Sequence, residues 1–243
     1  MNKQFRPVVI LHIPKTAGTS LRRMIQEHYQ PEEIFYVYGN DSAFTTFDDF
    51  KKLAPEEKDA YKIFMGHIPF NQNFFSGLNP IYITMLRDPV ERVLSYYHHV
   101  MQRQEWKGKD ISLLKYIEIS EDRQLSNHQT RVLAGYVNEP LNEIQLESAI
   151  NNLNNHFSVV GTTDNYKEVV EALCNLMGWE HKTIYRENIS TDRKQAEYYS
   201  KIEIEKIKKL NVFDLKLYDY VLKGSNNGVI LKSTCAISVP VGQ

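Results

Sequence analysis

The fold of this chain is constrained most by short apolar segments, rich in β-branched residues, that alternate with longer segments of helical periodicity. Four of these apolar segments lie at residues 8–13, 61–65, 81–86 and 157–161. Runs of this length and composition are typical of strands buried on both faces, and their alternation with helices indicates a mostly parallel sheet. The sequence therefore predicts an α/β fold with a central sheet flanked by helices.

The helical segments are recognised by apolar residues that recur at three- and four-residue spacing. Helices are predicted at residues 21–28, 89–100, 112–119, 127–134, 142–153, 166–177 and 196–223. A short apolar run at 229–231 fits an edge strand. Because 243 residues suit one sizeable domain, we expect a single domain over residues 1–243, with the segment after about residue 224 left unassigned.

Charge and composition limit the partners and the compartment. The formal net charge is −1, so no overall basic field attracts nucleic acid or an anionic membrane. No apolar run reaches about 18 residues, which predicts no membrane span, and the apolar stretch near the N-terminus is too short for a signal peptide. Cys174 and Cys235 fit two unpaired thiols in a reducing compartment. We expect a cytoplasmic protein, and its oligomeric state is left open.

The first candidate site is a loop between the first predicted strand and the first predicted helix. It reads Pro14-Lys15-Thr16-Ala17-Gly18-Thr19-Ser20. Small residues let the backbone approach an anion, the N–H groups at a helix start point toward it, and the lysine and hydroxyl groups can bind phosphate oxygens. Lys15 precedes Gly18, whereas the Walker A loop of ATPases has its lysine after the last glycine. The alternative is a plain turn in which Thr19 or Ser20 caps the helix and Lys15 is solvated.

The second candidate site follows the third predicted strand. It reads Arg87-Asp88-Pro89-Val90-Glu91-Arg92-Val93-Leu94-Ser95. Arg87 stands at the carboxyl end of a strand, the edge where α/β sheets bind ligands, and Ser95 lies on the same side of the following helix. Together they could hold a second phosphate group. The alternative is a simple helix start with Asp88 as the cap and Arg92 in solvent.

These two segments together resemble the sulfotransferases that use the donor PAPS (3′-phosphoadenosine 5′-phosphosulfate), in particular the branch with heparan sulfate 2-O-sulfotransferase and related bacterial proteins. The resemblance implies a P-loop-like sulfotransferase fold. It also implies that the loop at residues 14–20 binds the 5′-phosphosulfate of PAPS and that Arg87 and Ser95 bind its 3′-phosphate. It is clear over residues 8–100, thinner at 125–131 and 159–163, and weak in the tail.

The expected reaction moves a sulfuryl group to an acceptor hydroxyl and leaves 3′,5′-ADP. Lys15 is predicted to stabilise charge on the leaving group, and the acceptor needs a general base. His67 follows the second predicted strand in a Gly-His pair, and the resembling enzymes have a catalytic histidine in such a segment, so His67 is our candidate. His12 is the second candidate for the base. His98 and His99 are interpreted as surface or packing residues.

Other residues are less defined by the sequence. Thr191, Arg193 and Lys194 lie where the family folds a loop over the nucleotide, and we include Arg193 and Lys194 among the donor-binding residues. Four polar residues of the 125–131 segment could reach the 3′-phosphate or the acceptor, or could form a solvated helix face: Asn127, Gln129, Thr130 and Arg131. No set of side chains has the spacing of a metal site.

Two other functions are compatible with the sequence. One is an ATP-dependent kinase with a P-loop-like site, and the other is a nucleotide-binding module without catalysis. The acceptor class, a carbohydrate or another small molecule with a hydroxyl group, is not determined, because acceptor pockets are built from variable loops.

Overall fold

The computed structural model describes residues 6–38, 46–135, 140–179, 196–225 and 229–231. Within these residues, six strands form one sheet in the order β2-β3-β1-β4-β5-β6. Their bounds are β1 Val8–Leu11, β2 Ile34–Val37, β3 Ile63–Gly66, β4 Ile81–Leu86, β5 Phe157–Thr162 and β6 Val229–Leu231. The first five are parallel, and β6 pairs antiparallel to β5 at the edge. The predicted α/β fold is confirmed.

The four predicted buried strands and the edge strand are present, but β2 was missed. Its sequence, Ile34-Phe35-Tyr36-Val37, is rich in the aromatic and β-branched residues that favour strands, but it is only four residues long. In the sheet it pairs with β3, and its last residue Val37 lies beside Gly66. Gly66 is required there, because a Cβ atom would lie 1.9 Å from the carbonyl oxygen of Val37.

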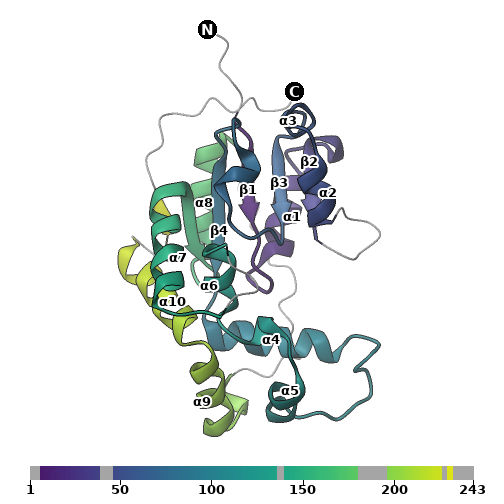
Figure 1. The fold of residues 1–243 in the computed structure, drawn as a ribbon, viewed down its shortest axis with the longest axis vertical. Coiled ribbons are helices and arrows are strands. Elements are labelled where there is room, and N and C mark those ends of the chain that lie inside the picture. The colour runs from purple at the N-terminus through teal and green to yellow at the C-terminus, as the bar shows by residue number, and fades with distance from the viewer. Residues whose placement is uncertain (1–5, 39–45, 136–139, 180–195, 226–228, 232–243) are drawn as a thin grey trace.

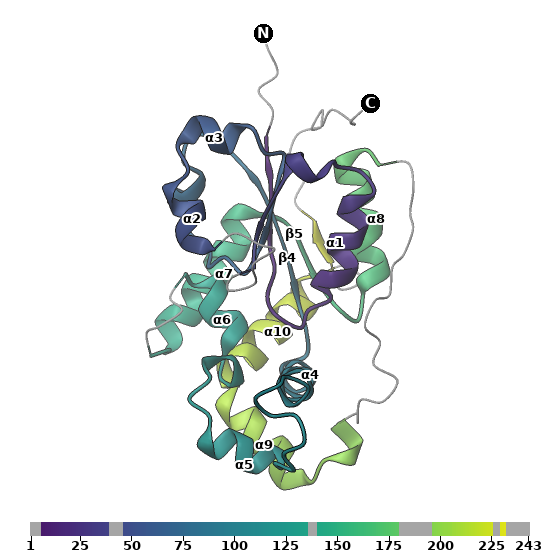
Figure 2. The same ribbon diagram turned by 90° about the vertical axis from the view of Figure 1, so that its right-hand side faces the viewer.

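Helices cover both faces of the sheet (Figure 2). On one face lie α1 Gly18–Gln26 and α8 Tyr166–Met177, which share an apolar core with the strands. On the other face lie α2 Phe47–Lys52, α6 His128–Leu133, α7 Glu143–His156 and α10 Val212–Gly224, with a second apolar core. The short helix α3 Pro55–Asp59 follows α2. Short 3₁₀ helices are found at Pro31–Glu33, Gln72–Phe75, Arg123–Leu125 and Ala196–Tyr198.

Three more helices form a third apolar cluster at one end of the molecule (Figure 1). They are α4 Pro89–Met101, α5 Leu113–Ile119 and α9 Lys201–Leu210. Since β4 ends at Leu86 and α4 begins at Pro89, this cluster lies on the side of the sheet where the parallel strands end. None of the helices in the described ranges is both long enough and apolar enough to cross a bilayer.

Two local predictions need correction. Neither Thr19 nor Ser20 caps α1: the helix already begins at Gly18, and the N-cap is Ala17 in a left-handed conformation without a side-chain cap. The predicted helix at 196–223 is divided, because α9 ends at Leu210 and α10 begins after Asn211. The buried Asn211 side chain donates to the carbonyl oxygens of Leu125 and Ile207, which fixes the break.

Candidate functional site

The candidate site lies along the edge where β1, β3 and β4 end side by side. In the sheet register, Leu11 of β1 pairs with Gly66 of β3 and with Thr84 of β4. The three segments that leave this edge carry Lys15, His67 and Arg87. The structure thus brings the two sequence motifs and the candidate base to a common edge, which is where α/β sheets bind their ligands.

The loop after β1 has an unusual backbone. Lys15 has φ of 72° and Ala17 has φ of 64°, both left-handed conformations that non-glycine residues rarely adopt. Between them Thr16 is buried, and its hydroxyl donates to the carbonyl oxygen of Ile13 at 2.8 Å. Loops of this kind turn several N–H groups toward one concave side, where they can surround an anion. Of the loop side chains, Thr19 is exposed and Ser20 is buried.

Gly18 is required by its neighbour His12. A Cβ atom at Gly18 would lie 1.9 Å from Nε2 of His12, so the imidazole rests directly on the glycine. The Nδ1 atom of His12 is 3.1 Å from the hydroxyl oxygen of Tyr38. Burial lowers the pKa of His12 well below its ordinary value, and the nearby His67, Arg22 and Lys15 lower it further. His12 is therefore a neutral side chain enclosed between the loop and Tyr38.

His67 lies directly after β3, where its backbone N–H donates to the carbonyl oxygen of Val37 at 2.8 Å. Its ring centroid is 5.0 Å from that of His12 and 4.9 Å from that of Tyr38. The residue is exposed as a whole, but the surrounding protein removes enough water from the ring to lower its pKa to about 4. His67 is therefore a neutral imidazole at neutral pH, the protonation state that a general base needs.

Tyr38 was missed by the sequence interpretation because it follows the unrecognised strand β2. Its ring also lies 5.7 Å from the guanidinium carbon of Arg22 on α1. Burial raises the pKa of its hydroxyl. The aromatic run that ends at Tyr38 was the available signal.

Arg87 links the two motifs. Its Nη1 donates to the carbonyl oxygen of Lys15 at 3.2 Å, and its Nη2 lies 3.4 Å from Oε2 of Glu91. Ser95 is half-buried two turns along α4. Asp88 accepts from the backbone N–H of Glu91 at 2.9 Å, so the predicted cap of α4 is confirmed.

Arg92 is not solvated, contrary to the alternative interpretation of this segment. Its side chain is fully buried and donates to the carbonyl oxygen of Gln124. Burial lowers the pKa of Arg92, and the nearby carboxylate of Asp214 opposes that effect. The side chain of Arg92 therefore lies in the protein interior and not at the surface.

One of the two alternatives for residues 125–131, a solvated helix face, is wrong for Asn127, Gln129 and Thr130, which are buried and bonded to protein groups. Arg131 is half-buried and donates to the carbonyl oxygen of Ser126 at 3.1 Å. His128 is buried as well. Burial lowers the pKa of His128, and so do the nearby Arg92 and His67. Of the late candidates, Thr191, Arg193 and Lys194 lie outside the described residues. His98 packs against Tyr199, 2.7 Å from its hydroxyl oxygen, and His99 is exposed.

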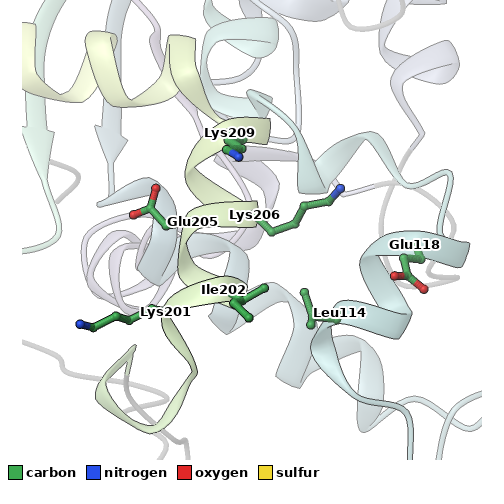
Figure 3. A pocket seen from close by; sticks show the side chains of 7 residues that line it. All are labelled: Leu114, Glu118, Lys201, Ile202, Glu205, Lys206 and Lys209. Carbon is green, nitrogen blue, oxygen red and sulfur yellow. The ribbon is translucent and has the colours of Figure 1, made fainter.

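A separate groove of about 500 Å³ lies between α5 and α9 (Figure 3). Its lining residues are charged or aliphatic: Leu114, Glu118, Lys201, Ile202, Glu205, Lys206 and Lys209. None of the candidate residues lines it, and it offers no imidazole or hydroxyl group. This groove is distinct from the edge that carries Lys15, His67 and Arg87. In the described part of the chain, no three His, Cys, Asp or Glu side chains are grouped to hold a metal.

A family model described as the sulfotransferase family matches residues 2–221. The chain belongs to this family. The matched residues include both motifs and His67. They also include Gln129 and Asp214. No curated protein sequence matches the chain. This sulfotransferase therefore transfers a sulfuryl group. Its residues Lys15, His67 and Arg87 follow strands that end at one edge of the sheet.

Proposed function

We propose that this sulfotransferase takes the sulfuryl group from PAPS and transfers it to the hydroxyl group of a carbohydrate or another small molecule. The observation that carries the proposal is the hydrogen bond from Arg87 to the carbonyl oxygen of Lys15. This bond joins two phosphate-binding motifs at one edge, next to a neutral histidine. A donor with two separate phosphate groups fits such a pair of motifs.

The donor-binding roles follow from the two motifs. The loop of Lys15, Thr16, Ala17, Gly18, Thr19 and Ser20 holds the 5′-phosphosulfate, and the close seat of His12 on Gly18 leaves no room for a larger residue there. Arg87 and Ser95 hold the 3′-phosphate. Arg193 and Lys194 are proposed to bind the nucleotide as well.

The chemistry requires an acceptor oxygen, the sulfur and the leaving oxygen in line. His67 accepts the proton of the acceptor hydroxyl while that oxygen bonds to sulfur. The bond from sulfur to the 5′-phosphate oxygen breaks, and Lys15 stabilises the charge on that oxygen. His67 is favoured over His12 because the His12 ring is occupied on both sides, by Gly18 and by Tyr38.

Calorimetry with 3′,5′-ADP, 5′-AMP and ATP, each in EDTA, tests the donor. We expect tighter binding of 3′,5′-ADP than of 5′-AMP, because Arg87 and Ser95 add contacts to the extra phosphate. Equal affinities, or a strict need for Mg²⁺, would contradict the donor assignment and favour the kinase. A transfer assay with radiolabelled PAPS and a panel of sugars, lipids and phenols then separates an enzyme from a binding module.

A further inference from the structure

Gln129 holds the backbone of Arg87 from a helix 42 residues away in sequence. Its side chain on α6 is fully buried. Its Oε1 accepts from the backbone N–H of Arg87 at 2.9 Å, and its Nε2 donates to the carbonyl oxygen of Arg87 at 2.9 Å. One carboxamide therefore bonds both polar backbone groups of a single residue, as a neighbouring strand would.

Arg87 needs this partner because it stands between two elements. β4 ends at Leu86 and α4 begins at Pro89, so neither the sheet nor the helix fixes the backbone of Arg87. The carbonyl oxygen of Leu86 is already taken by the backbone N–H of Thr163. Gln129 continues the pairing for one more residue. The two bonds from Gln129 fix the backbone from which the Arg87 side chain projects toward Lys15 and Glu91.

Gln129 is itself held firmly by the fully buried carboxylate of Asp214 on α10. This carboxylate accepts from the backbone N–H of Gln129 at 3.1 Å, from the backbone N–H of Thr130 at 2.7 Å and from the hydroxyl of Thr130 at 2.7 Å. It thus satisfies N–H groups at the start of α6, where the N-cap Asn127 makes no side-chain cap.

We propose that Gln129 is a positioning residue of the donor site, which sets the guanidinium of Arg87 for the 3′-phosphate. The inference rests on the proposed function, in which Arg87 binds that phosphate. Gln129 touches neither donor nor acceptor; it acts through the backbone of Arg87. A purely structural glutamine would affect stability and would leave the preference for the 3′-phosphate unchanged.

The test measures this preference as the ratio of the dissociation constants of 5′-AMP and 3′,5′-ADP in the full-length protein. Gln129→Met keeps the length of the side chain and removes both bonds to Arg87. We expect it to reduce the ratio about fivefold or more, since lost buried hydrogen bonds are of this order. In an Arg87→Ala background, Gln129→Met should cause no further reduction, because its effect passes through the guanidinium.

Thr130→Val is the matched control. It removes a buried hydrogen bond to Asp214 in the same turn of α6 without touching Arg87. It should lower the melting temperature and keep the ratio. If Gln129→Met does not fold, Gln129→Asn replaces it, because the shorter carboxamide stays neutral and polar but cannot reach both backbone groups of Arg87.

The outcomes separate the two proposals. If the wild-type protein shows no preference for 3′,5′-ADP, the assignment of Arg87 fails and this inference fails with it. If Arg87→Ala abolishes the preference but the folded Gln129 variants keep it, the donor site stands and the positioning role is wrong. A further reduction by Gln129→Met in the Arg87→Ala background would also overturn it.

Discussion

Three histidines, His12, His67 and His128, lie near one another at the candidate site, and burial lowers the pKa of each. They differ in solvent exposure and in the residues that they contact. His12 is enclosed by Gly18 and Tyr38, and His128 is buried, whereas His67 is exposed. His67 is thus the most exposed of the three.

Removing the side chain of Lys15 and removing that of His67 should affect donor binding and turnover differently. Lys15→Ala keeps the backbone carbonyl that binds Arg87 and deletes the charge near the leaving group. We expect weaker binding of 3′,5′-ADP, by about 1.5–3 kcal/mol, and slower transfer. His67→Ala should leave the affinity for 3′,5′-ADP nearly unchanged and lower the turnover number by ~10²–10⁴-fold. Near-normal turnover in folded His67→Ala would move the base to His12.

The dependence of the rate on pH should reflect the lowered pKa of His67. A general base must be unprotonated to act. With a pKa of about 4 for His67, the rate should stay unchanged from neutral pH down to about pH 5 and should fall at lower pH. An ordinary histidine would lose activity already near pH 6.5. The measurement is kcat/KM for the acceptor at saturating donor, from pH 4 to 8.

The pH profile needs a control for unfolding of the protein at low pH. His12 and His128 also have a lowered pKa in the folded state, so the unfolded chain binds more protons as the pH falls below about 6.5, and stability decreases in that range. Circular dichroism at each pH separates unfolding from loss of the base. A descending limb near pH 6.5 in protein that is still folded would contradict the lowered pKa of His67.

Among the elements, the junction of β1 and α1 is closely packed. Gly18→Ala would place a methyl group within 1.9 Å of the His12 ring, so either the ring or the loop must move. We expect a loss of stability of about 1–3 kcal/mol and weaker donor binding. Chemical denaturation and calorimetry with 3′,5′-ADP measure the two effects.

Adding His12→Ala to Gly18→Ala should restore part of the lost stability, because the double variant lacks the ring that clashes with the new methyl group. Gly224→Ala is the neutral control, since a Cβ atom there meets its nearest neighbour, Cδ1 of Ile230, at 3.9 Å. If Gly18→Ala were as stable as Gly224→Ala, the close contact with His12 would be wrong.

The elements also show what the sequence could predict. Long periodic segments were predicted to the residue or nearly so, for example α8 at Tyr166–Met177 and β4 at Ile81–Leu86. β2 was missed although β1 and β3 are equally short, and its place in the sheet is set by pairing with β3. The break at Asn211 was missed because its cause is a long-range contact with Leu125.

At the scale of the whole molecule, the sequence located both motifs proposed to bind the donor but not the residues that support them. Lys15 and Arg87 carry local signals, a strand before each and a helix after each. Gln129 lies in the 125–131 segment, which the sequence left open between a ligand contact and a solvated face, and Asp214 carries no local signal, since an aspartate on an amphipathic helix is usually solvated. Their function depends on α6 and α10 packing against each other, which only the folded chain defines.

The contact of Asp214 with α6 also sets a time at which the site can form during synthesis. A ribosome releases the chain from the N-terminus, so Lys15 and Arg87 emerge early. A nascent chain that has emerged through residue 179 already contains β1 to β5, Arg87 and Gln129. It still lacks the carboxylate that holds the first turn of α6. The donor site proposed here is therefore completed only when α10 leaves the ribosome and docks, so a chain interrupted before that point contains β1 to β5 but lacks this support of the site.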